Sequence, residues 1–95
     1  MKNVKVIVRG DRSGVFYGEF VKREGREVEL KNCRRLWYWD GANSISELAE
    51  KGTQKPNNCK FTVVVEKIEI LDAIEVIECT NKASKSIESV NIWRY

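Results

Sequence analysis

The amino-acid sequence predicts an α+β fold, a single small domain spanning residues 1–95 and built mainly from an antiparallel β-sheet of about six strands with two short helices. Two observations carry this prediction. Apolar and polar residues alternate with a period of two over most of the chain, and the period changes to that of a helix in two segments. Short turns rich in glycine and polar residues separate the strand segments, as in antiparallel sheets.

Three strands are expected in the first third of the chain. The first covers residues 4–9 and ends in a turn at 10–14, the second covers 15–21, and a hairpin leads into the third at 27–31. Gly18 lies between aromatic residues inside the second strand. A glycine there predicts a bulge or the close approach of another backbone segment.

The fourth expected strand is the run Arg34-Arg35-Leu36-Trp37-Tyr38-Trp39, joined to the third by Asn32 and Cys33. Successive side chains of a strand point to opposite faces. The run therefore divides into two sets, with Arg35, Trp37 and Trp39 on one face and Arg34, Leu36 and Tyr38 on the other. Because a sheet with one wet face does not normally place two tryptophans outward, we expect a strand covered on both sides or a surface for stacking.

A short helix should follow this strand. Ser44-x-x-Glu47 is a capping box, Ile45 and Leu48 form an apolar pair, and Gly52 stands in the stop position. The next segment, 53–58, holds the chain's single proline and is expected to be a loop.

The last third should return to strands and then close with a second helix. Strands are expected at 61–65 continuing through 68–70, and at 74–77 after a bend near Asp72. Thr80 is in position to cap a helix whose apolar face is formed by Ala83, Ile87 and Val90.

Composition excludes several classes of function. The chain has no histidine, and its three cysteines are widely spaced with no CxxC pair, so neither a metal site nor a disulfide framework is expected. The net charge of +3 is weaker than dedicated duplex-binding proteins usually carry. No apolar run approaches the length of a membrane span, and the first residues lack the apolar core of a signal peptide. We therefore expect a cytoplasmic protein without a cofactor.

The aromatic strand and the start of the following helix together hold the parts of a nucleotide site within eleven residues. Arg34 or Arg35 would meet phosphates, and Trp37 or Trp39 would stack on a base. Asn43 and Ser44 would contribute the helix start, whose free amides and dipole favour an anion. The alternative is structural, with the tryptophans packing in a core or subunit interface and Asn43 or Ser44 only capping the helix.

Two further segments have the same two interpretations. Trp93 and Arg94, followed by Tyr95, repeat the aromatic and basic residues of the strand, and such a tail is expected to dock on its own domain, although it could also close a pocket. The loop at 10–14 has two glycines that could cradle a phosphate, but its spacing is that of a hairpin turn.

The stretch Arg35 to Ala42, with its Trp-Tyr-Trp followed by Gly-Ala, resembles a family of small proteins from bacteriophages and prophages. The Ser-x-x-Glu helix and the stretch Ala73 to Thr80 extend this likeness over most of the chain from about Gly14 onward. In size and element order the chain is also similar to phage sponge proteins that counter Thoeris defence by binding cyclic ADP-ribose isomers. That resemblance implies a host bacterial cytoplasm and a nucleotide signal as the ligand.

The leading hypothesis is a non-catalytic, homo-oligomeric phage protein that sequesters a cyclic or modified nucleotide signal of host immunity, with Arg34, Arg35, Trp37, Trp39, Asn43, Ser44, Trp93 and Arg94 as ligand-binding residues. A protein-binding module is the alternative, because Trp, Tyr and Arg are the residues most enriched in interface hot spots. Single-stranded nucleic-acid binding ranks below both. An enzyme ranks last, because no pair of nucleophile and base is recognisable in the sequence.

Overall fold

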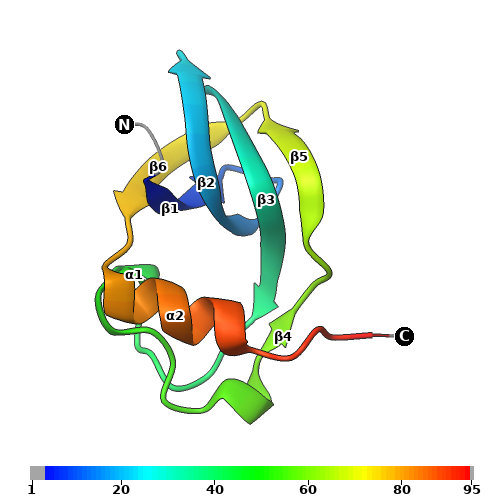
Figure 1. The fold of residues 1–95 in the computed structure, drawn as a ribbon. Helices are drawn as coiled ribbons and strands as arrows, with labels where there is room; N and C mark the ends of the chain where they lie inside the picture. Colours follow the sequence, from blue (N-terminus) through cyan, green and yellow to red (C-terminus); the bar gives the residue numbers. More distant parts are fainter. Residues whose placement is uncertain (1–3, 95) are drawn as a thin grey trace.

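The computed structural model describes residues 4–94 and confirms the predicted α+β architecture of a six-stranded antiparallel sheet with two helices (Figure 1). The elements in chain order are β1 (Lys5–Gly10), β2 (Val15–Glu24), β3 (Glu27–Tyr38), α1 (Ile45–Lys51), the 3-10 helix η1 (Pro56–Asn58), β4 (Lys60–Phe61), β5 (Val65–Ile70), β6 (Ala73–Glu78) and α2 (Asn81–Ser89).

The sheet curls because its two edges are joined by a very short turn. Strands β1, β2 and β3 form a meander, β6 pairs with β1, and β5 pairs with the first half of β3 while β4 pairs with its end. Strands β5 and β6 therefore lie on opposite sides of the meander. Only Leu71 and Asp72 connect them, so the sheet must bend round on itself (Figure 1).

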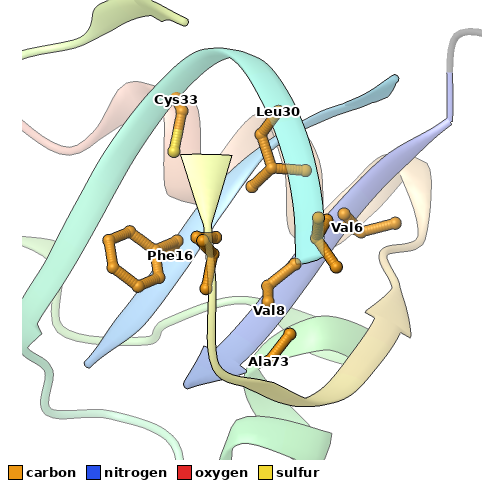
Figure 2. Packing of buried hydrophobic residues seen from close by; sticks show 8 residues of the cluster. Val6, Val8, Phe16, Leu30, Cys33 and Ala73 are labelled. Carbon is orange, nitrogen blue, oxygen red and sulfur yellow. The ribbon is translucent and has the colours of Figure 1, made fainter. Parts of the chain in front are cut away.

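Two hydrophobic clusters occupy the two faces of the curled sheet. Inside the curl lie Val6, Val8, Phe16, Val28, Leu30, Cys33, Ile70 and Ala73, several of which are seen in Figure 2. Outside it, beneath the two helices and β4, lie Ile7, Tyr17, Leu36, Leu48, Ala49, Phe61, Ile87 and Val90. Strand β1 is apolar at three successive positions because Val6 and Val8 face one cluster and Ile7 the other.

The third and fourth expected strands are in fact one long strand, β3, and this part of the prediction was wrong. A bulge at Asn32 and Cys33 joins them: Asn32 has φ 48°, and the pairing shifts between Tyr17–Arg34 and Glu19–Lys31. The bulge confirms the expectation for Gly18. A Cβ at Gly18 would lie 3.0 Å from the Cys33 Cβ and 3.1 Å from the Lys31 carbonyl oxygen.

Helices α1 and α2 begin directly after Ser44 and Thr80, the two capping residues that the sequence predicts. The Ser44 hydroxyl accepts from the Glu47 amide at 3.2 Å, and the Thr80 hydroxyl accepts from the Ala83 amide at 3.0 Å. The expected strand at 61–65 is shorter than predicted, since β4 ends at Phe61 and β5 begins at Val65. Neither helix among residues 4–94 has the length and apolar run that crossing a membrane requires.

Candidate functional site

One face of the end of β3 forms a hollow with the loop between β1 and β2. Arg35, Leu36, Trp37 and Trp39 line this hollow together with residues 13–15, and its volume is about 190 Å³. Arg35 and Trp37 lie two positions apart in β3 and line the same hollow, as the alternation predicts. Trp39 follows the end of β3, and Leu36 from the other predicted set also lines the hollow, so the division into two faces does not hold for the whole run. We call this hollow the aromatic hollow.

Arg35 is held at the wall of the aromatic hollow by contacts on two sides. Its guanidinium lies 4.5 Å from the centre of the Phe16 ring, and it donates a hydrogen bond to the Ser13 carbonyl. Gly14, at φ 115°, packs so closely that a Cβ there would lie 3.3 Å from Arg35 Nη1. A guanidinium has five N–H donors, and within residues 4–94 the Ser13 carbonyl is the acceptor that it meets. Donors therefore remain for an anion.

The loop that holds Arg35 is itself fixed by Asp72, from the turn between β5 and β6. One carboxylate oxygen of Asp72 accepts from the Arg12 and Ser13 amides at 2.8 and 3.1 Å, and the other accepts from the Ser13 hydroxyl at 2.6 Å. An internal carboxylate thus takes the amides that could have cradled a phosphate. The loop is a turn, in agreement with the preferred interpretation of its sequence.

We expect Asp72→Asn to lower the melting temperature at neutral pH and to weaken its dependence on pH in acid. The Ser13 hydroxyl and the Arg12 amide hold the pKa of Asp72 below its ordinary value of 3.8. A depressed folded-state pKa means that the contribution to stability is full above the ordinary pKa and is lost as the pH falls through the folded-state pKa. Thermal unfolding followed from about pH 7 to about pH 2 measures both effects.

Asp11→Asn is the matched control for this prediction, because Asp11 is exposed in the same loop and faces Arg26 at 3.8 Å. Its pH profile should follow that of the unmodified protein. Identical profiles for Asp72→Asn and the unmodified protein would show that Asp72 does not stabilise the loop.

Trp37 is the most exposed tryptophan, at 63%, and it stacks on Trp93 from the C-terminal tail. The ring centroids are 6.1 Å apart and the planes differ by 14°, within the range of offset stacking. Lys60 adds its ammonium 5.5 Å from the centre of the Trp93 ring. These two rings and Lys60 extend the wall of the aromatic hollow as an exposed surface with a positive charge at its edge.

The C-terminal tail docks on the domain, as its sequence predicts. Ile92 forms a parallel bridge with Phe61, and the Trp93 amide donates to the Phe61 carbonyl at 2.8 Å, so the tail runs beside β4 (Figure 1). Arg94 is exposed at the end of this segment. The prediction for Tyr95 lies outside the described residues.

Trp39 differs from Trp37 because it is half-buried and packs against the outer hydrophobic cluster. Both interpretations of the tryptophans therefore apply, one to each residue. Trp39 supports the wall of the hollow from the core, and Trp37 presents its ring to solvent.

Arg34 does not belong to this site, which corrects one expectation from the sequence. It lies on the other face of β3, is 4% exposed, and donates to four carbonyl oxygens, those of Phe61, Thr62, Ile87 and Val90, at 3.0 to 3.2 Å. Burial lowers the pKa of its guanidinium from the ordinary value. Its role is to close the C-terminal end of α2 onto β4.

The start of α1 is not part of the aromatic hollow either, which corrects the expectation for Asn43 and Ser44. The Asn43 amide donates to a Glu47 carboxylate oxygen at 2.6 Å, and the Ser44 hydroxyl caps the Glu47 amide. A carboxylate therefore already occupies the place where a phosphate was expected, and its negative charge opposes a second anion.

Five contributors to the site were not among the predicted site residues: Ser13, Gly14, Val15, Leu36 and Lys60. The sequence of the loop at 10–14 favours a hairpin turn, with a phosphate cradle as the alternative, and predicts no contact to Arg35. Nothing in the local pattern separated Lys60 from other exposed lysines. Their contributions depend on contacts with residues more than twenty positions away in the chain.

No curated protein and no solved structure matches the chain significantly. One family model does match, over residues 3–87, and its description is a domain of unknown function, DUF6948. The match includes all of the aromatic strand and ends before Trp93 and Arg94. Because it covers most of the 95 residues, the chain belongs to the DUF6948 family.

Proposed function

We propose that the protein binds and sequesters a cyclic or modified nucleotide through the aromatic hollow, as a phage-encoded, non-catalytic sponge that counters a host immune signal. The observation that carries this proposal is that the exposed Trp37 ring lies in one hollow with Arg35, whose guanidinium still has N–H donors available for a ligand. A base can stack on the indole, and a phosphate can take the remaining donors of the arginine.

The size of the hollow supports an oligomeric form of this proposal. Its volume of about 190 Å³ is below the roughly 300–1,000 Å³ of pockets that enclose a drug-sized ligand. It therefore accommodates one ring system, and the rest of a dinucleotide-sized ligand would extend over Trp37, Trp93 and Lys60. A second copy of the chain placed against that surface would complete the enclosure, which is why we propose a homo-oligomer in the bacterial cytoplasm.

The direct test is calorimetric titration of the protein with a panel of cyclic mono- and dinucleotides and cyclic ADP-ribose isomers. We expect one class to bind with micromolar affinity or better, and the ligand to be recovered intact after heat denaturation because no step of catalysis is involved. Absence of binding across the panel by a folded protein would refute the proposal.

A protein-binding module is the second candidate, favoured by the aromatic residues exposed around the same strand. Trp37, Tyr38 and Trp93 are 63%, 50% and 44% exposed. Such residues are typical of interface hot spots. Tyr38 does not line the hollow, so Tyr38→Ala distinguishes the two functions: it weakens capture of a protein partner but not binding of a nucleotide in the hollow.

A further inference from the structure

A second hollow, of about 260 Å³, lies on the outer face of the sheet beside α2 and away from the aromatic hollow. Six polar side chains surround it: Lys5, Tyr17, Glu19, Asn32, Arg34 and Glu88. They come from β1, β2, β3 and the end of α2, so four separate elements converge on this point. We call it the polar hollow.

The bulge in β3 forms the floor of the polar hollow. Gly18 lines this floor, and the opposing backbone is displaced where Asn32 takes φ 48°. A non-glycine residue with positive φ is uncommon, and bulges are over-represented beside binding and active sites. The sheet is thus irregular at the place where its outer face is hollowed.

The charges around the polar hollow balance. Glu88 accepts from the Lys5 ammonium at 2.6 Å and from the Tyr17 hydroxyl at 2.5 Å on the same oxygen. Across the hollow, the Asn32 amide donates to Glu19 at 2.7 Å. Burial raises the pKa of Tyr17, which keeps its hydroxyl a donor at neutral pH.

Arg34 adds a buried cation to this balance. Within residues 4–94 its guanidinium bonds only carbonyl oxygens, four in number, and no carboxylate neutralises it directly. With Lys5 it contributes two positive charges to the lining, against the two carboxylates of Glu19 and Glu88.

We propose that the polar hollow binds a small zwitterion, a free α-amino acid with an uncharged side chain. A ligand with net charge would leave one lining charge unmatched, and a wholly apolar ligand would remove four charged groups from water without replacing their partners. A zwitterion satisfies both signs. Its carboxylate meets the Lys5 ammonium, with the buried charge of Arg34 behind it, and its ammonium meets Glu19. Its side chain lies on Val64, an exposed apolar residue at the rim.

This proposal does not depend on the nucleotide function, because the two hollows share no lining residue. The experiment follows backbone amide resonances of the uniformly ¹⁵N-labelled full chain during titration with free L-leucine, L-valine, glycine, L-lysine and L-glutamate, each to about 10 mM. We expect saturable shifts at Gly18 and Asn32 with leucine and valine, weaker shifts with glycine, and none with lysine or glutamate.

Two variants test the assignment of contacts. Lys5→Gln and Glu19→Gln should each weaken leucine binding about two- to tenfold, as expected for loss of one charged hydrogen-bonding partner. Lys85→Gln removes an equal charge from an exposed position of α2 and should leave binding unchanged. Thermal unfolding confirms that each variant is folded. The proposal is overturned if no amino acid shifts these resonances, or if lysine and glutamate bind as well as leucine.

Discussion

Arg34→Met is expected to destabilise the protein by about 3–5 kcal/mol, because it removes a buried cation and all of its hydrogen bonds. The Arg34 guanidinium donates hydrogen bonds to four carbonyl oxygens, two from the end of α2 and two from the segment around β4. Methionine fills a similar volume and donates nothing, so the Thr62 and Val90 carbonyls would lose the donor that they meet within residues 4–94. The Phe61 and Ile87 carbonyls would each keep only a backbone amide, that of Trp93 and that of Val90. Because small domains have roughly 5–15 kcal/mol of total stability, a large part of it would be lost.

Urea denaturation, followed by circular dichroism, measures this loss as a fall in the midpoint. Arg34→Lys should be intermediate, since an ammonium keeps the charge but cannot reach four carbonyls with the geometry of a planar fork. Arg12→Met is the matched control, because that side chain is exposed in the loop before β2. If Arg34→Met and Arg12→Met lowered the midpoint equally, the carbonyl contacts of Arg34 would contribute nothing to stability.

Trp37→Ala is expected to weaken binding of the nucleotide about 5- to 150-fold while changing stability by less than about 1 kcal/mol. The loss of binding corresponds to about 1–3 kcal/mol of stacking on one base. The small effect on stability follows from its exposure of 63%, with the stack on Trp93 as its main tertiary contact. Calorimetry with the nucleotide identified in the panel, together with urea denaturation, separates the two quantities.

Trp39→Ala should instead reduce stability more than nucleotide binding. Trp39 packs against the outer hydrophobic cluster, and its removal should cost about 2–3 kcal/mol of stability. Leu71→Ala is the control for exposure, since Leu71 is 67% exposed in the turn between β5 and β6 and lines neither hollow. Unchanged affinity in a folded Trp37→Ala variant would contradict the proposed stacking role.

Local signals in the sequence were sufficient to predict where the helices begin and to predict part of the lining of the aromatic hollow. The caps at Ser44 and Thr80 mark both helix starts, because a cap is a contact between residues three positions apart. The placement of Arg35 and Trp37 in one hollow follows in the same way from the two-residue period of a strand, because both lie in β3. Gly18 signalled the bulge, although not that the bulge would merge two expected strands into β3.

The roles of the individual charged groups depend on partners that are distant in the chain. Arg34 and Arg35 are neighbours of identical type, yet one is buried against the end of α2, more than fifty residues away, and the other lies at the wall of a hollow. Similarly, the loop at 10–14 is closed to phosphate only because Asp72 reaches its amides. No local pattern distinguishes these outcomes.

The sequence by itself therefore determined the α+β class, the starts of both helices and the common side of Arg35 and Trp37, since each depends on periodicity or on contacts within one turn. Only the tertiary structure decided which arginine is structural, that the helix start is occupied by Glu47, and that Trp93 returns to stack on Trp37. These outcomes follow from the way the curled sheet brings distant segments together, where burial and competition for hydrogen-bond partners fix the role of each side chain.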